Sequence, residues 1–189
     1  MTLENEVENY VVNFTAEEKR VQNLDDKGDF FRFINMPGVE SFLYIVENPV
    51  EDKSAHRYFG GSLRYLFTRG KSFFTIGILK PLDRDEDNDK QVNDIVTYTL
   101  GKDFYPRYLG RGKRTFFNPY SGAQIGGMVL TSKEGIDNIF TFEPHIGLEL
   151  FKNKYVILDV RVGYIFPLDK ENIKNLRGLT QNVSFNVVF

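Results

Sequence analysis

Between Ser41 and the last residue, apolar and polar side chains alternate with a period of two, and this pattern constrains the fold more than any other feature. In residues 140–150 every second side chain is apolar, whereas the positions between them carry Thr, Glu, His, Gly and Glu. Residues 155–168 and 182–189 repeat the pattern. Because successive side chains of a strand point to opposite faces, each segment predicts a β-strand with one apolar and one largely polar face.

Four other segments alternate more weakly, and residues 42–48 are expected to form the first strand, so we predict eight strands in all. The expected strands are residues 42–48, 56–69, 72–82, 95–109, 116–131, 140–150, 155–168 and 182–189. Short connections are expected at residues 69–71, 110–114 and 152–154, and longer ones at residues 48–55, 83–94, 132–138 and 169–177. Short turns on one side and longer loops on the other are typical of membrane barrels.

Composition excludes several classes of protein. The chain has no Cys, which rules out a disulfide scaffold, a thiolate metal site and a Cys nucleophile, and its only His residues are His56 and His145. A net charge of −2 without a basic cluster argues against nucleic acid as a partner. The longest uncharged run, residues 115–132, holds Asn, Pro, Gln and three Gly, so no transmembrane helix is expected. The first six residues lack the pattern of an export signal, so the chain is either cytoplasmic or a mature form.

Two architectures combine eight antiparallel strands with one apolar face. A soluble lipocalin-like barrel points this face inward around an apolar ligand, whereas a membrane barrel points it at lipid and keeps a polar lumen. The turn lengths favour the membrane barrel, and so do the glycines, which fall mostly on the polar face, where a narrow lumen must fit long charged side chains beside small ones. These glycines are Gly60, Gly77, Gly101, Gly122, Gly126, Gly147 and Gly163.

A membrane barrel of this kind would enclose charges of both signs. The side chains expected to form a lumen charge network are Arg64, Asp103, Arg107, Glu143, His145, Glu149, Asp159 and Arg161. If Glu149 and Asp159 share the inward face, a three-residue turn at 152–154 places His145 opposite Arg161. Such a network acts either as an ion-paired plug, because buried charges must be paired, or as a path for protons or ions.

The last eight residues, 182–189, have apolar residues at alternate positions and a terminal Phe. They resemble the assembly signal of Gram-negative outer-membrane barrels, carried here by Val183, Phe185, Val187 and Phe189. Residues 117–127 and 142–149 are similar to strand segments of the small OmpA-like and OmpW-like barrel superfamily. The resemblance covers residues 41–189 and implies an outer-membrane location, outer-membrane lipid and the barrel assembly machinery as partners, and both chain ends on the periplasmic side. The missing Trp is a departure, since Phe and Tyr must then form the aromatic girdles.

Residues 1–40 are expected to form a separate, partly helical extension. The first 29 residues hold eight acidic and three basic side chains, and Thr15 to Glu18 has the form of a capping box, which predicts a short helix over about residues 16–22. The resemblance places this acidic extension in the periplasm. The three short turns on that side are all basic and could meet lipid phosphates, the extension or a periplasmic partner. The alternative is that their charges only solubilise the turns.

The loop at residues 83–94 spaces carboxylates as in a calcium-binding loop, at Asp83, Asp85, Asp87, Asp89 and Asp94. Oxygen-rich loops of this spacing suit hard cations. However, Asn88 replaces the usual Gly, Lys90 replaces an apolar residue, and the last position holds the shorter Asp. The loop is therefore either a calcium site or a solvated acidic loop, and no other cofactor is expected.

No catalytic residues are predicted. His145 falls inside the lumen without a Ser beside it, and His56 lies near a rim without a carboxylate fixed by spacing. The chain has no Gly-x-Ser-x-Gly segment, phosphate loop or zinc motif. We therefore predict a non-enzymatic outer-membrane barrel with a plugged, charged lumen, acting as a structural or interaction protein through its loops and periplasmic face. The alternative is the soluble lipocalin-like barrel.

Overall fold

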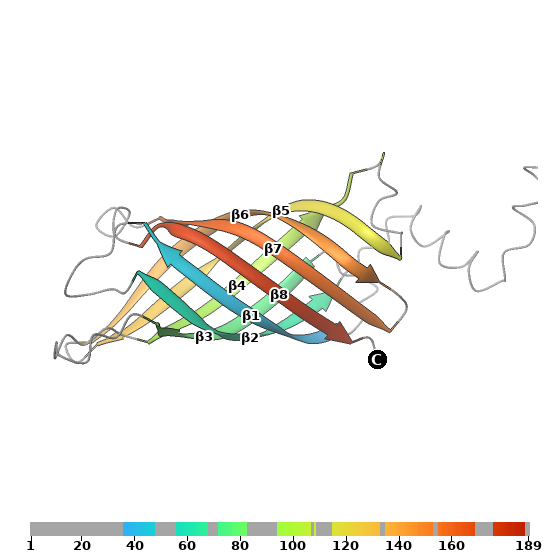
Figure 1. Ribbon diagram of the computed structural model, residues 1–189. Helices are drawn as coiled ribbons and strands as arrows, with labels where there is room; N and C mark the ends of the chain where they lie inside the picture. Colours follow the sequence, from blue (N-terminus) through green and yellow to red (C-terminus); the bar gives the residue numbers. More distant parts are fainter. Residues whose placement is uncertain are drawn as a thin grey trace, which may run out of the picture. The chain divides into compact units, whose positions relative to one another are not determined.

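The computed structural model describes residues 36–47, 56–67, 72–82, 94–106, 108, 115–132, 135–152, 155–168 and 176–187. They form eight strands: β1 (Met36–Val46), β2 (Arg57–Phe67), β3 (Ser72–Pro81), β4 (Ile95–Phe104), β5 (Phe116–Ser132), β6 (Gly135–Lys152), β7 (Val156–Pro167) and β8 (Gly178–Val187). Each strand pairs antiparallel with the next, and β8 pairs with β1, so the sheet closes into a barrel (Figure 1). The predicted all-β, eight-stranded, antiparallel up-and-down barrel is confirmed. None of the described segments is a helix long and apolar enough to cross a bilayer.

The strands are strongly tilted. A path that starts at Met36 and passes from each residue to its partner on the next strand goes once around the barrel. It returns to β1 at Val46, ten residues further along the same strand. A stagger of this kind tilts the strands of a closed barrel by about 35–45°. Figure 1 shows strands that run obliquely to the barrel axis. We call the end at which β1 ends and β2 begins the loop end. The opposite end, at which β1 begins and β8 ends, is the turn end.

Several strands extend beyond their predicted limits. β1 begins at Met36 rather than at residue 42, because residues 36–41 add to the ladder with β2 and residues 38–41 also pair with β8. Met36 to Glu40, assigned from the sequence to the extension, thus belong to the barrel, and residues 1–35 lie outside the described part. β5 and β6 remain paired up to Ser132 and Gly135, so the longer loop predicted at 132–138 is wrong.

The two faces of the barrel have opposite chemistry. Arg64 and Arg161 are each 2% exposed and Glu143 is 3% exposed, whereas Leu63 and Ile146 on the outer face are 68% and 67% exposed. A soluble barrel needs the reverse arrangement, with apolar side chains inside and charges in water. The lipocalin-like alternative is therefore wrong, and the exterior has the composition of a surface that faces hydrocarbon.

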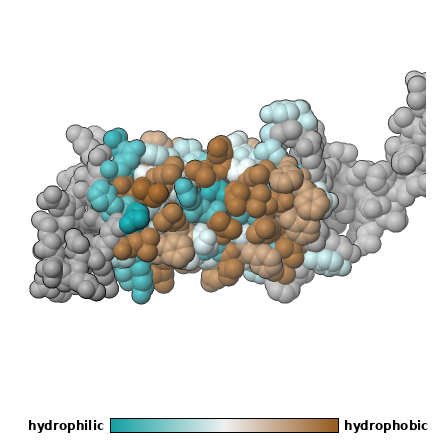
Figure 2. All heavy atoms as spheres, in the orientation of Figure 1, coloured by the Kyte–Doolittle hydropathy of each residue, from teal (hydrophilic) through white to brown (hydrophobic). Residues whose placement is uncertain are grey.

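An apolar belt surrounds the described part of the barrel. Figure 2 shows it as a brown band with hydrophilic residues toward its left-hand side in that view. Exposed aromatic side chains lie near the strand ends: Phe104, Phe116 and Tyr155 at the turn end, and Phe59 and Phe166 toward the loop end. Phe and Tyr thus supply the aromatic positions that Trp often fills at membrane interfaces.

The lumen is layered. Toward the loop end its lining is apolar and tightly buried, a cluster that we call the loop-end cluster. Its members are Phe42, Tyr44, Val46, Tyr58, Leu79, Ile95, Met128, Leu130, Ile139, Ile165 and Leu176. A smaller apolar cluster of Met36, Leu66, Phe73 and Ile157 lies toward the turn end. Buried polar and charged side chains fill the space between them. The prediction of a polar lumen did not include the loop-end cluster.

Candidate functional site

The polar layer of the lumen holds seven of the eight charged side chains predicted from the sequence, and we call it the lumen network. Arg64, Asp103, Glu143, His145, Glu149, Asp159 and Arg161 all point inward and are at most 4% exposed. Glu40, which the sequence analysis did not select, joins them at 4%. Arg107 lies outside the described residues.

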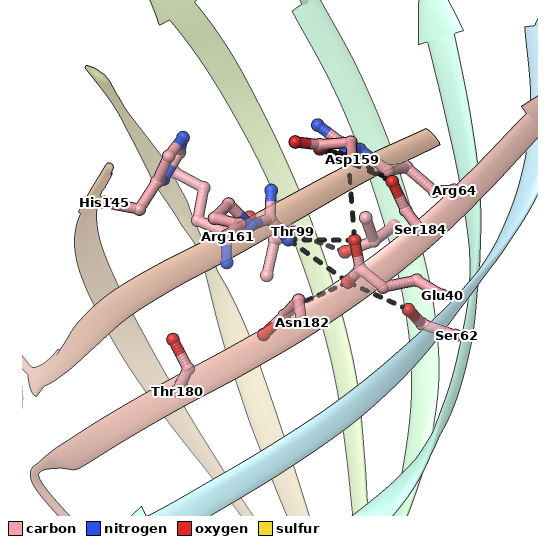
Figure 3. A network of polar contacts seen from close by, with 12 residues as sticks. Glu40, Ser62, Arg64, Thr99, His145, Asp159, Arg161, Thr180, Asn182 and Ser184 are labelled. Carbon is pink, nitrogen blue, oxygen red and sulfur yellow. Dashed lines mark hydrogen bonds and ion pairs between the residues drawn. The ribbon is translucent and has the colours of Figure 1, made fainter. Parts of the chain in front are cut away.

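Arg64 on β2 is the centre of the network. Its Nη1 atom donates to Asp159 Oδ2 at 2.6 Å and to Ser184 Oγ at 2.9 Å, and its Nη2 atom donates to Asp103 Oδ2 at 3.3 Å. Asp159 also accepts from the Tyr120 hydroxyl at 2.6 Å. One guanidinium thus connects β2 to β4, β7 and β8, as a rigid fork of several donors can. Figure 3 shows Arg64 beside Asp159 and Ser184.

Glu40 on β1 organises the second half of the network. Arg161 Nη2 donates to both carboxylate oxygens of Glu40 at 3.1 Å, and Asn182 Nδ2 donates to Oε1 at 2.6 Å (Figure 3). Ser62 Oγ donates to the same oxygen at 3.2 Å, and Arg64 lies 3.9 Å from Oε2. Glu40 thus contacts both guanidinium groups. The sequence feature that points to Glu40 is its place in the inward-facing row Met36, Gly38, Glu40 and Phe42.

Phe73 on β3 lies between the two cations. The guanidinium carbon of Arg64 is 4.5 Å from the ring centroid, and that of Arg161 is 4.9 Å from it. Both distances are within the range of cation–π attraction. The ring fits there because Gly101 is opposite Phe73 on β4, where a Cβ atom would come within 2.2 Å of the ring. Gly101 thus leaves room for a larger inward side chain, as predicted for the glycines of the lumen.

His145 on β6 pairs with Asp103, not with Arg161. Its Nε2 atom is 2.7 Å from Asp103 Oδ1, and its ring lies between Phe73 and Tyr120. The register predicted for β6 and β7 is wrong by two residues: His145 is opposite Gly163, Gly147 is opposite Arg161, and Glu149 is directly opposite Asp159.

The predicted three-residue turn is too short: Phe151 pairs with Leu158 rather than with Tyr155, a shift of three residues, and a β-bulge reduces this shift to two. A β-bulge leaves Leu150 without a partner on β7, because the pairing passes from Glu149 and Asp159 to Phe151 and Leu158. Across the sheet Phe117 has φ of 58°, an unusual value for a bulky residue. A bulge inserts one extra residue on one strand, and side-chain alternation could not reveal it.

Glu143 is held by neutral donors among the described residues. Gln124 Nε2 donates to Oε2 at 2.5 Å, and Thr180 Oγ1 donates to Oε1 at 2.7 Å. The amide oxygen of Gln124 in turn accepts from Thr99, which is 2.5 Å from Thr75 Oγ1. This polar row crosses the lumen between the ion pairs and the loop-end cluster.

Glu149 forms the turn-end side of the network. It accepts from the Tyr105 hydroxyl at 2.7 Å and from Lys152 Nζ at 2.9 Å. Burial, followed by the charge of Glu149, raises the pKa of the Tyr105 phenol, so Tyr105 stays protonated and donates. Glu149 therefore has its own partners and does not depend on those of Asp159, the like charge opposite it.

The charged side chains of the network are buried, and most of them pair with one another. His145 is 4% exposed and wedged between two rings, so a substrate from either end cannot reach it. The described residues contain no group of three or more His, Cys, Asp or Glu side chains placed to hold a metal ion. Of the predicted calcium loop, only Asp94 is described, and it lies half-buried just before β4. Asp83, Asp85, Asp87 and Asp89 lie outside the described residues.

The residues of the predicted assembly signal lie on the lipid side of β8. Val183 and Phe185 are 49% and 46% exposed, Val187 is half-buried, and Phe189 lies outside the described residues. Ser184 and Asn186, between them, point into the lumen.

His56 is exposed immediately before β2 at the loop end.

Comparison with known proteins supports the fold. The N-terminal β-barrel domain of Pseudomonas aeruginosa OprF matches with a TM-score of 0.50 and 13% identity, over 84% of this chain and all of that domain. Neisserial surface protein A (NspA) also matches with a TM-score of 0.50, with 12% identity over 83% of this chain and 97% of its own. No family model matches the sequence. No curated protein matches it either.

At this level of identity the likenesses show the fold alone. The chain shares the closed, eight-stranded antiparallel barrel fold of these two proteins. This fold, with its apolar exterior and charged interior, agrees with the outer-membrane location predicted from the sequence.

Proposed function

We propose that this protein is a closed, non-enzymatic outer-membrane barrel that serves as a structural or interaction protein through its two rims. The observation that carries the proposal is that the lumen is filled by two consecutive layers, the lumen network and the loop-end cluster. An eight-stranded barrel has an interior just wide enough for side chains to fill. A solute would have to displace both ion pairs and packed apolar side chains.

The most direct test of closure is conductance in planar bilayers. We expect the folded wild-type protein to produce no discrete conductance steps. A matched pair of variants shows whether the assay can detect opening: Tyr44→Ala with Tyr58→Ala removes two stacked rings from the loop-end cluster, whereas Leu63→Ala with Ile146→Ala removes similar apolar side chains from the outer face. Steady steps from the wild-type protein at low voltage would contradict the proposal and favour a small-solute channel.

If the lumen is closed, any partner must bind at one of the two rims of the barrel. At the turn end, the basic residues of the short connections are proposed to meet the acidic N-terminal segment, lipid phosphates or an acidic periplasmic partner. These residues are Arg69, Lys71, Arg111, Lys113, Arg114, Lys152 and Lys154. Limited proteolysis of protein folded in vesicles separates the first possibility from the others. Deletion of residues 1–29 should increase cleavage at the basic turns if the segment covers them, and unchanged cleavage would exclude it as their partner.

A further inference from the structure

The apolar belt is interrupted near its middle on one face of the barrel. Gln181 on β8, Ser41 on β1 and Gly61 on β2 all lie exposed on the outer face. Gln181 pairs with Leu43 on one side and with Val162 on the other, and Ser41 pairs with Gly61. In Figure 2, which has the orientation of Figure 1 with β7, β8 and β1 toward the viewer, hydrophilic atoms appear within the brown band.

Gln181 is surrounded by apolar neighbours within its own barrel. Leu179 and Val183 precede and follow it on the outer face of β8, and Leu43 and Val162 flank it on the adjacent strands. Among the described residues, neither Gln181 nor Ser41 makes a side-chain hydrogen bond. Tyr98 provides a contrast, since its outward hydroxyl donates to Asn138 Oδ1 at 3.1 Å. In hydrocarbon an amide without a partner costs several kcal/mol.

The surface beside these polar groups is hollowed. One hollow of about 260 Å³ lies over β7, β8 and β1 and is lined by Ser41, Gln181 and Phe59, among others. A second hollow of about 610 Å³ lies over β1, β2 and β3 and is lined by Gly61, Leu63 and Phe59, among others. Phe59, 49% exposed, thus borders both hollows as a ridge between them.

We propose that this face binds a second copy of the same chain, related by a two-fold axis along the membrane normal. Two copies inserted in the same direction hold Gln181 at the same depth, so the two side chains can meet only each other or the partner's Ser41 at that level. A carboxamide carries one acceptor and two donors, and a pair of them is self-complementary, as a symmetric interface requires. The Phe59 ridge of one copy can enter a hollow of the other.

The depth of Gln181 favours a protein partner over lipid. An acyl chain can fill the hollows but offers no donor or acceptor to the amide. Association of proteins inside a bilayer depends on close packing and on polar contacts, because the lipid is as apolar as the side chains. The hollowed face with its polar centre supplies both, whereas around Ile125 on β5 the outer face is apolar, with Leu100 and Phe142 as cross-strand neighbours.

Cysteine cross-linking tests the dimer cleanly because the natural chain contains no Cys. The reporter is Leu43→Cys, which lies beside Gln181 and leaves the amide in place. The matched control is Ile125→Cys, 58% exposed on β5. Each full-length variant is folded into phospholipid vesicles at a low protein-to-lipid ratio and oxidised, and dimers are counted on denaturing gels. We expect Leu43→Cys to form disulfide-linked dimers and Ile125→Cys to form few.

A second variant tests the role of the amide. Adding Gln181→Leu to the Leu43→Cys chain should lower the dimer population about tenfold, which corresponds to 1.4 kcal/mol and to the scale of one polar contact inside a membrane. The mobility of unboiled samples verifies that every variant is folded. The proposal is overturned if Leu43→Cys gives no more dimer than Ile125→Cys, in which case lipid covers this face. It is also overturned if Gln181→Leu leaves the cross-linking unchanged, because the amide then plays no part in the contact.

Discussion

The loop-end cluster and the lumen network fill the same barrel but depend on their neighbours in different ways. Most members of the cluster are apolar side chains that need only matching volume, so they can be exchanged for others of similar size. Tyr44 differs, because its hydroxyl also donates to the Leu176 carbonyl. The network consists of charges that need particular partners, because a buried charge whose partner is removed remains uncompensated. We therefore expect the network to tolerate far less substitution than the cluster.

The largest expected effect is at Arg64. Arg64→Met keeps most of the side-chain volume but leaves Asp103 and Asp159 without their shared cation, which should lower the free energy of unfolding by about 3–5 kcal/mol. The measurement is equilibrium unfolding in urea, with the folded fraction read from unboiled gels. Lys80→Met, which removes an exposed cation from the outer face, is the matched control and should change stability little. If Arg64→Met lowered the free energy of unfolding as little as Lys80→Met does, the lumen network would not depend on particular partners more than the loop-end cluster does.

In the loop-end cluster the size of the replacement should decide the effect. Leu79 is completely buried. Leu79→Ala creates a cavity and should cost about 3 kcal/mol, whereas Leu79→Met conserves volume and should cost less than about 1.5 kcal/mol. The same unfolding assay compares the two variants. Equal losses would show that the cluster, like the network, requires specific side chains.

A smaller effect is expected where a glycine makes room for the network. A Cβ atom on Gly147 would come within 2.1 Å of the Tyr120 ring, and the Tyr120 hydroxyl donates to Asp159. Gly147→Ala should therefore displace the ring and cost about 1–3 kcal/mol, the range for an overpacked interior. Gly61→Ala on the outer face is the control, since the nearest atom to its Cβ would be 3.6 Å away. Unchanged stability of Gly147→Ala would mean that Tyr120 has room to move.

The smallest expected effect is at Ser62, which donates one neutral hydrogen bond to Glu40 at 3.2 Å. Because Glu40 keeps Arg161 and Asn182, Ser62→Ala should cost only about 1 kcal/mol. The change is measured as a small shift of the urea midpoint. A loss close to that of Arg64→Met would indicate that the hydroxyl holds Glu40 in place.

Side-chain alternation was sufficient to predict the number of strands and, for the strands other than β1, which side faces lipid. It predicted the inward direction of Glu149 and Asp159 because parity is preserved over a strand. It could not predict their partners, because a shift of two residues between β6 and β7 leaves the alternation on both strands unchanged.

Alternation indicated Glu40 only weakly and did not indicate the loop-end cluster. Glu40 follows Pro37 and Gly38, which interrupt an apolar row, and its place in β1 depends on pairing with both β2 and β8. Residues 42–46 are apolar on both faces, so their pattern does not distinguish the lumen from the lipid side. Pairing between distant strands therefore decided these two features.

The ion pairs join segments that are far apart along the chain. Glu40 and Arg161 are 121 positions apart, and Arg64 and Asp159 are 95 apart. Neither pair can form in a half-built sheet, whose unmatched charges would border hydrocarbon at a high cost. Closure of β1 against β8 and neutralisation of the interior are thus a single event, which penalises partly inserted intermediates and makes folding into the bilayer all-or-none.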